Sequence, residues 1–143
     1  MDAKDTLIER FKFFYKDLKR IPLPQIGDIY DDNVIFKDPV QEVRNIEQLH
    51  AYLSDLCLDV HSGRFEYLDQ MVAEHSAYIK WNMHFKHPKL GKQTITVRGI
   101  SQIQFNERIY YHEDVYDLGQ MLYEQVPLLG GVVKGLKKRL AVN

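Results

Sequence analysis

The chain opens with apolar and polar residues that alternate at the period of a helix. Residues 5–20 carry charged side chains on one face and large apolar side chains on the other; the apolar members are Leu7, Phe11, Phe14 and Leu18. This spacing predicts an amphipathic helix with Asp5 as its cap. Two prolines within 21–25 should end it, because a helix interior does not tolerate proline.

A second helical pattern follows after a short connection. We expect a brief helical piece over 24–32 and then a strand over 34–37. Asn45 is a typical cap residue, and the apolar residues after it return at helical spacing: Ile46, Leu49, Leu53, Leu56 and Val60. This pattern predicts a helix that buries one face.

In the second half of the chain the apolar positions recur at every second residue, which is the period of a strand with one buried face. Asn106 and Glu107 are expected to form a tight turn between the last two strands, and the predicted strands cover 64–73, 77–85, 94–105 and 108–117. Helices that precede an antiparallel meander are typical of an α+β fold with the helices on one face of the sheet.

The composition fits a single globular domain and excludes several classes of protein. Of the 143 residues 45% are hydrophobic, so the chain can bury a sizeable core. The net charge of -1 argues against a nucleic-acid partner. Cys57 is the only cysteine, which fits a reducing compartment, and no apolar run approaches the roughly 20 residues of a membrane span. The first residues also lack the apolar core of a secretory signal, so we expect a cytoplasmic protein.

Residues 118–143 form a distinct extension of the domain at 1–117. Their apolar positions repeat at helical spacing, and the opposite side carries the basic residues Lys134, Lys137, Lys138 and Arg139. One interpretation is an amphipathic helix that packs on the same domain and points its basic residues at water. The other is a weak peripheral contact with an anionic membrane, which attracts each basic residue by about 1 kcal/mol.

Three stretches resemble a known family: IYDDNVIFKDPVQEVRNIEQLHAYL at 29–53, WNMHF at 81–85, and VRGISQIQF at 97–105 followed by IYYHEDVYD. In this order they resemble the nuclear transport factor two-like superfamily, which includes ketosteroid isomerases and SnoaL-like polyketide cyclases. The resemblance covers residues 5–117. It implies a cone-shaped, curved antiparallel sheet wrapped around the N-terminal helices, with an apolar pocket at the open end, and it implies a homodimer.

The resemblance places Asp38 at the position of the general base of ketosteroid isomerases, an aspartate followed by proline. A carboxylate in an apolar cavity is partly desolvated, which favours its use as a base. The alternative is a turn residue that binds local backbone amides. On the last strand, His112 and Asp114 share a face with Tyr116 and could act as its catalytic partners. The alternative for them is an exposed strand face or a dimer interface.

Two hydrogen-bond donors of the isomerases are replaced in this chain. Phe14 stands where the resemblance expects a tyrosine, with Tyr15 one position away, and Ser101 stands where it expects an aspartate. Each lost oxyanion donor costs roughly 100- to 1000-fold in rate, so ketosteroid isomerisation is not expected. The expected pocket residues are Phe14, Tyr15, Trp81, Met83, Phe85, Ser101 and Tyr116.

Two functions remain open at this stage. One is a cofactor-independent isomerase, cyclase, dehydratase or hydrolase that acts on a hydrophobic molecule such as a sterol, polyketide or lipid. The other is a non-catalytic module that binds such a ligand or another protein. The likeness to SnoaL-like cyclases adds Asp117 at the end of the last strand, with His84 or His87 as its partner. No metal is expected, because these two histidines face opposite sides of a strand and only one cysteine is available.

Overall fold

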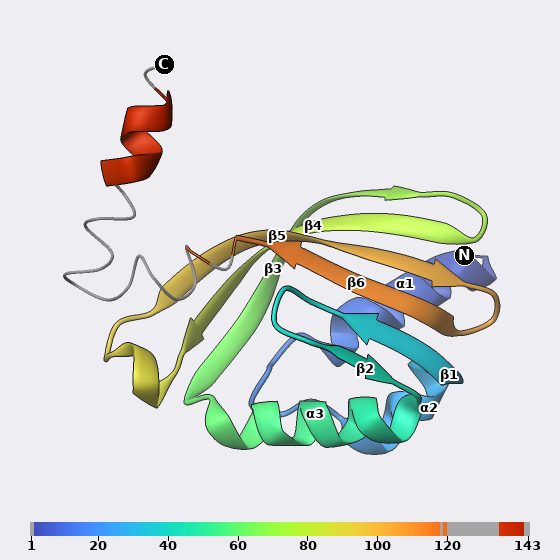
Figure 1. The fold of residues 1–143 in the computed structure, drawn as a ribbon. Helices are drawn as coiled ribbons and strands as arrows, with labels where there is room; N and C mark the ends of the chain where they lie inside the picture. Colours follow the sequence, from blue (N-terminus) through green and yellow to red (C-terminus); the bar gives the residue numbers. More distant parts are fainter. Residues whose placement is uncertain (1, 118, 120–134, 142–143) are drawn as a thin grey trace.

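The computed structural model describes residues 2–117, 119 and 135–141, and Figure 1 shows its fold. Its N-terminal half holds the helices α1 (Ala3–Phe14), α2 (Ile26–Ile29) and α3 (Ile46–Asp59). Two single helical turns are η1 (Leu23–Gln25) and η2 (Pro88–Leu90). The strands are β1 (Tyr30–Lys37), β2 (Glu42–Arg44), β3 (Ser62–Val72), β4 (Ser76–Lys86), β5 (Ile95–Phe105) and β6 (Ile109–Tyr116).

These strands form one sheet in the order β2-β1-β6-β5-β4-β3. The run from β3 to β6 is the predicted antiparallel meander. In contrast, β1 pairs with β6 in parallel, so the expectation of an antiparallel sheet is wrong for this pair. The period of apolar residues within a strand does not specify which distant strand it joins.

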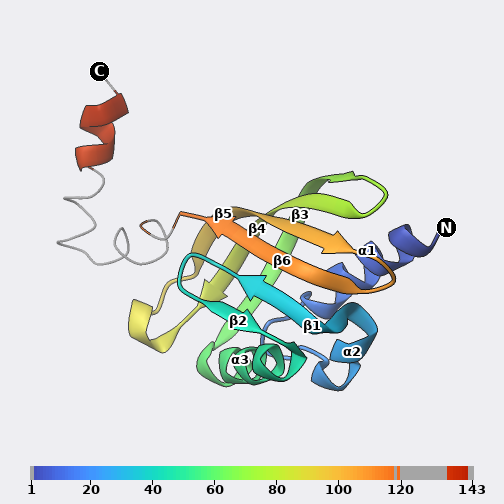
Figure 2. The same ribbon diagram turned by 45° about the vertical axis from the view of Figure 1, so that its right-hand side comes forward.

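The predicted α+β class is confirmed. Figures 1 and 2 show a curved sheet with α1, α2 and α3 on its inner side. Both layers supply side chains to the main core, and its fully buried members include Ile8, Phe11, Phe14, Leu49, Leu53, Ile79 and Ile103. The curved sheet therefore holds the helices on the side where a cavity can form.

The first helix differs from its prediction at both ends. The Asp2 side chain, and not that of Asp5, caps α1 by accepting a hydrogen bond from the Asp5 amide. The helix ends at Phe14, although the apolar spacing continues to Leu18. The Leu18 amide donates instead to the carbonyl of Gly63 at 2.8 Å. A contact with β3 thus replaces the last predicted helical turn. The spacing of apolar residues within this segment could not indicate a contact with a strand so far along the chain.

The region around β1 shows a second set of differences. The predicted helical piece over 24–32 shrinks to η1 and α2, and the strand already begins at Tyr30, which pairs with Ile109 of β6. The three-residue strand β2 was not predicted, because its short, largely exposed sequence has no clear period. The predicted cap is confirmed: the Asn45 side chain accepts from the Gln48 amide at the start of α3.

A bulge sets which face of β6 points inward. The pairing shifts between Gln104 and Phe105, and Ile109 and His112 are both buried although they lie three residues apart. The two-residue period of a regular strand predicts Ile109 on the face opposite His112, Asp114 and Tyr116, and this prediction is wrong. A bulge adds one residue to one strand and so changes the side on which every later residue lies. It directs His112 and Asp114 toward the helices.

The outer face of the sheet is partly apolar. It exposes Met71, Tyr78, Ile100 and Val115, and in the sheet register Met71 pairs with Tyr78 and Ile100 with Val115. The homodimer that the family resemblance implies stays a prediction.

Most of the extension at 118–143 lies outside the described residues, including its predicted apolar positions up to residue 133. Within it residues 135–141 are helical, and Leu136 and Leu140 are exposed there. Lys137 donates to the carboxylate of Asp117 at 2.7 Å. The packing of this extension on the domain stays a prediction. No helix in the described part of the chain is long and apolar enough to cross a membrane.

Candidate functional site

A cavity of about 370 Å³ lies between the inner face of the sheet and α3. Its walls are mainly apolar, with contributions from Phe36 of β1, Leu53 of α3 and Phe65 of β3. Of the predicted site residues, seven line it: Tyr15, Asp38, Trp81, Met83, Phe85, Asp114 and Tyr116. Phe14, Ser101 and His112 are not among its lining residues. Phe14 lies in the core. Ser101 and His112 each form a hydrogen bond to Asp114, which lines the cavity.

Asp38 lies in the turn between β1 and β2 and combines both roles considered for it. Its Oδ1 atom accepts hydrogen bonds from the amides of Val40 at 2.8 Å and Gln41 at 3.0 Å. Its Oδ2 atom accepts from the hydroxyl of Tyr52 on α3 at 3.0 Å. The carboxylate therefore closes a local turn and, at 8% exposure, also lines the cavity. Three donors already occupy most of its acceptor sites.

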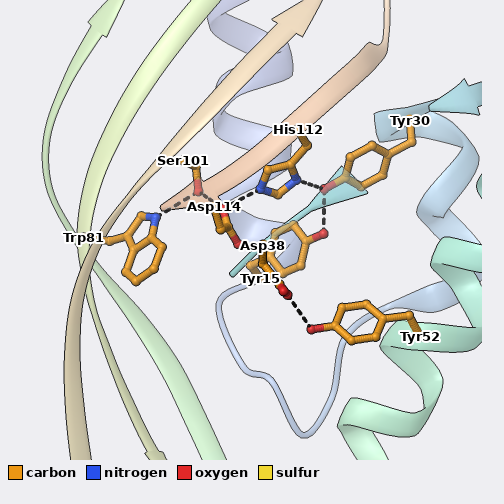
Figure 3. Close-up of polar contacts among 8 residues, drawn as sticks. All are labelled: Tyr15, Tyr30, Asp38, Tyr52, Trp81, Ser101, His112 and Asp114. Atoms are coloured by element: carbon orange, nitrogen blue, oxygen red, sulfur yellow. Dashed lines mark hydrogen bonds and ion pairs between the residues drawn. The ribbon is translucent and has the colours of Figure 1, made fainter. Parts of the chain in front are cut away.

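Asp114 is the second carboxylate of the cavity, and it is held differently. Its Oδ1 atom accepts from Ser101 Oγ at 2.5 Å and lies 2.7 Å from His112 Nε2. Ser101 in turn accepts from the indole N–H of Trp81 at 2.8 Å. Figure 3 shows these contacts. Within the described structure no hydrogen bond reaches the Oδ2 atom of Asp114, so this oxygen keeps its lone pairs for the cavity.

His112 connects Asp114 to a pair of buried tyrosines. It is 1% exposed, and its Nδ1 atom lies 2.7 Å from the hydroxyl of Tyr30. That hydroxyl lies 2.5 Å from the hydroxyl of Tyr15 (Figure 3). Tyr15 is itself one of the residues that line the cavity. When Asp114 is a carboxylate, the Nε2 atom of His112 donates to it, and in the neutral ring the Nδ1 atom then accepts from Tyr30. The Tyr30 hydroxyl then accepts a hydrogen bond from the Tyr15 hydroxyl. Each residue in the row Tyr15, Tyr30 and His112 therefore donates to the next, and the last one donates to Asp114.

The tyrosines of this region stay neutral and can donate hydrogen bonds. Burial raises the pKa of Tyr15 and Tyr30 well above the ordinary tyrosine value. Burial and, next, the neighbouring Asp38 carboxylate raise the pKa of Tyr52. Burial and then both carboxylates raise the pKa of Tyr116. Tyr116 therefore lies within electrostatic reach of Asp38 and Asp114, and in the described structure its hydroxyl has no hydrogen-bond partner.

We expect the domain to lose stability above about pH 10 because its buried tyrosines ionise more easily in the unfolded chain. A folded pKa raised above the ordinary value of 10.0 contributes stability that is complete below that pH. The contribution is lost as the pH rises toward the folded pKa. Titrating tyrosinate absorbance and near-ultraviolet circular dichroism together would check this. Part of the nine tyrosines should ionise only as the dichroism signal disappears; ionisation of all of them in a folded protein would contradict it.

Two residues of this site carried no role in the sequence prediction. Tyr30 begins β1, and Tyr52 follows Leu49 by three residues on the inner face of α3. The helical spacing of Tyr52 with Leu49 and Leu53 was a usable signal for it. Nothing in the local sequence around Tyr30 indicates a bond to His112, which is 82 residues away.

The other predicted polar candidates lie elsewhere. His84 is on the outer face of the sheet, where its ring nitrogens contact Thr96 at 2.8 Å and Glu66 at 3.1 Å. Asp117 is exposed and binds Lys137, whereas His87 lines the mouth of the cavity. Across the described ranges no three histidine, cysteine or acidic side chains are grouped as ligands for a metal ion.

A protein-family model described as the SnoaL-like domain matches residues 13–112. Among curated proteins none matches the chain. Solved structures do: a candidate SnoaL-like polyketide cyclase from Shewanella putrefaciens CN-32 gives a TM-score of 0.72 at 17% identity. The match covers 85% of this chain and 94% of that protein.

Two further structures have the same fold. A nuclear transport factor two-like protein of unknown function from Burkholderia pseudomallei K96243 gives a TM-score of 0.74 at 12% identity, covering 85% of this chain and 96% of that one. An epoxide hydrolase from M. tuberculosis, of the LEH-like type, gives 0.69 at 11% identity, covering 99% and 97%. At such low identities the likeness concerns the fold alone.

Proposed function

This chain belongs to the SnoaL-like domain family, and from that premise we propose that it is a cofactor-independent acid–base enzyme for a small, largely apolar molecule. One observation carries the proposal. Asp114 is held on Oδ1 by His112 and Ser101, while its Oδ2 atom faces an apolar cavity without a protein partner among the described residues. A base needs this combination of a fixed orientation and a free lone pair.

The proton transfer assigned to Asp114 is as follows. Its Oδ2 atom takes a proton from a C–H group of the ligand or from a water molecule, and the electron pair stays on that carbon or oxygen. Tyr116, kept neutral by burial and by the nearby carboxylates, donates a hydrogen bond to the oxygen on which negative charge develops. Asp114 later returns the proton to the product, so the enzyme is restored.

His112 supports this step without touching the ligand. Because it donates from Nε2 to Oδ1, it keeps Oδ2 turned toward the cavity, and Tyr30 holds the imidazole in this tautomer. We therefore describe His112 as a positioning residue. Asp38 and Tyr52 form a second polar pair of the cavity, and Asp38 directly follows Lys37, which pairs with Glu113 next to Asp114. Tyr52 and its carboxylate partner can orient a polar group of the ligand.

The reactions compatible with one base and neutral phenols are isomerisation, cyclisation, dehydration and hydrolysis. A polyketide cyclase and an epoxide hydrolase, the activities named for two proteins of the same fold, both fall within this range. The sterol, polyketide or lipid expected from the sequence would fill the apolar walls of the cavity.

The test is a screen of apolar ketones, lactones and epoxides for conversion by the wild-type protein, with Asp114→Asn as the decisive variant. Asparagine keeps an oxygen that can accept from His112 and Ser101, so the fold and the affinity for the ligand should be retained. It cannot take up the proton, so kcat should fall about 100-fold. Mass spectrometry measures conversion, and ligand-observed NMR measures binding.

Asp69→Asn is the matched control, since Asp69 is exposed on β3 and its carboxylate accepts only from the adjacent amide of Gln70 in the described structure. This variant should keep wild-type activity. An Asp114→Asn protein with unchanged kcat would refute the assignment. Binding of several compounds with conversion of none would support the non-catalytic ligand-binding module instead.

A further inference from the structure

The mouth of the cavity is basic along the connection between β4 and β5. This connection includes η2, and the residues from 86 to 92 contain no acidic side chain; their charged or titratable members are Lys86, His87, Lys89 and Lys92. Of these only His87 and Lys89 line the cavity, and among the described residues they are its only basic lining residues. The segment is the yellow turn of Figure 1.

Both residues have donors available for a ligand. The Nδ1 atom of His87 accepts from the amide of Lys89 at 3.1 Å, so the neutral ring carries its proton on Nε2 and can donate from there. In the described part of the chain no carboxylate lies within 4.0 Å of the Lys89 ammonium group. A basic group without an acidic partner at a cavity mouth favours an anion there.

The two ends of the cavity differ in charge. Asp114 pairs in the sheet with Ser101 of β5. The basic turn ends where β5 begins, at Ile95, which lies six positions before Ser101 along the same strand. Six residues of strand extend up to about 20 Å. An anionic group would be repelled beside the carboxylates and attracted at η2, so charge fixes the direction in which an elongated ligand enters.

We propose that the ligand is an apolar molecule with one anionic group, such as a carboxylate or sulfonate, which Lys89 and His87 bind at the mouth of the cavity. The inference rests on the proposed function, because it concerns the same cavity and places the reacting part of the ligand near Asp114. It adds the chemical class of the ligand and two residues that determine specificity.

A matched pair of fluorescent probes tests the proposal. Anilinonaphthalene sulfonate and phenylnaphthylamine share their aromatic rings, and only the first carries a negative charge. We expect Lys89→Met to weaken binding of the sulfonate about fivefold, and to leave the neutral probe within about twofold, because methionine keeps the apolar stem without the charge. The difference should shrink in high salt.

Lys92→Met is the control, because Lys92 belongs to the same exposed turn but does not line the cavity. It should change neither affinity. Equal weakening by Lys89→Met and Lys92→Met would mean that the turn acts as a diffuse basic surface, and no effect of Lys89→Met would mean that the anion is not bound there; either result overturns the proposal.

The neutral probe separates this inference from the proposed function. If the wild-type protein binds neither probe, the ligand cavity itself is refuted, and the basic mouth is refuted with it. If phenylnaphthylamine binds and Lys89→Met leaves the sulfonate affinity unchanged, only the anionic ligand is refuted. In that case the Asp114→Asn experiment still tests the proposed function.

Discussion

Replacing His112 with leucine is expected to lower the free energy of unfolding by about 3 kcal/mol. The imidazole is buried and makes hydrogen bonds on both ring nitrogens, one of them to the carboxylate of Asp114. Leucine fills a similar space but removes a charged and a neutral hydrogen bond from an almost fully buried position. Urea denaturation followed by Trp81 fluorescence would measure the change.

His84→Leu is the matched control for this prediction. His84 also lies on a strand and also has contacts on both ring nitrogens, but its side chain is 20% exposed whereas that of His112 is 2% exposed. Water can replace its lost partners, so the expected cost is below about 1 kcal/mol. Equal losses in the two variants would show that burial of the His112 network does not determine its contribution.

The His112→Leu variant also tests the role of this residue in catalysis. If His112 only positions Asp114, the variant should keep its affinity for the ligand and lose kcat, and the pH profile of kcat should change. A purely structural role would leave the pH profile of the remaining activity unchanged.

The second large effect is expected for Gly99→Ala, with a loss of about 3 kcal/mol in the free energy of unfolding. A Cβ atom at Gly99 would lie 2.3 Å from the Cη2 atom of Trp81 and 2.6 Å from its Cζ3 atom. The indole is itself fully buried, and its N–H is bound to Ser101, so it cannot turn away without losing this bond. Glycine is required here by the close approach of the ring.

Gly27→Ala provides the comparison. Gly27 lies in α2, and a Cβ atom there would meet nothing within 4 Å. Alanine should therefore leave stability unchanged or raise it by up to about 1 kcal/mol. Denaturation curves of both variants would settle the matter, and a Gly99→Ala protein as stable as Gly27→Ala would contradict this account of the Trp81 packing.

The two predictions concern one wall of the same site. Trp81, Ser101, Asp114 and His112 form a continuous hydrogen-bonded row across β4, β5 and β6. Displacing Trp81 would remove a donor from Ser101, and removing His112 would free one side of the Asp114 carboxylate. Both variants should therefore also change ligand binding or turnover, although neither Gly99 nor His112 lines the cavity.

Local sequence determined the elements whose signals lie within a few neighbouring residues. The period of apolar residues predicted α3 and its cap Asn45, the strands β3 to β6 and the α+β class, because these features depend on short-range geometry. The family resemblance added the cone-shaped fold and placed Asp38 in the site, and the spacing within the last strand put His112 and Asp114 on one side.

Only the tertiary structure decided how these residues meet. The parallel pairing of β1 with β6 brings Tyr30 to His112, and the bulge opposite Gln104 turns His112 and Asp114 inward. The chain leaves α1 at Tyr15, so this tyrosine, and not Phe14, reaches the cavity. Each outcome depends on contacts between residues far apart along the chain, and a local period contains no information about such partners.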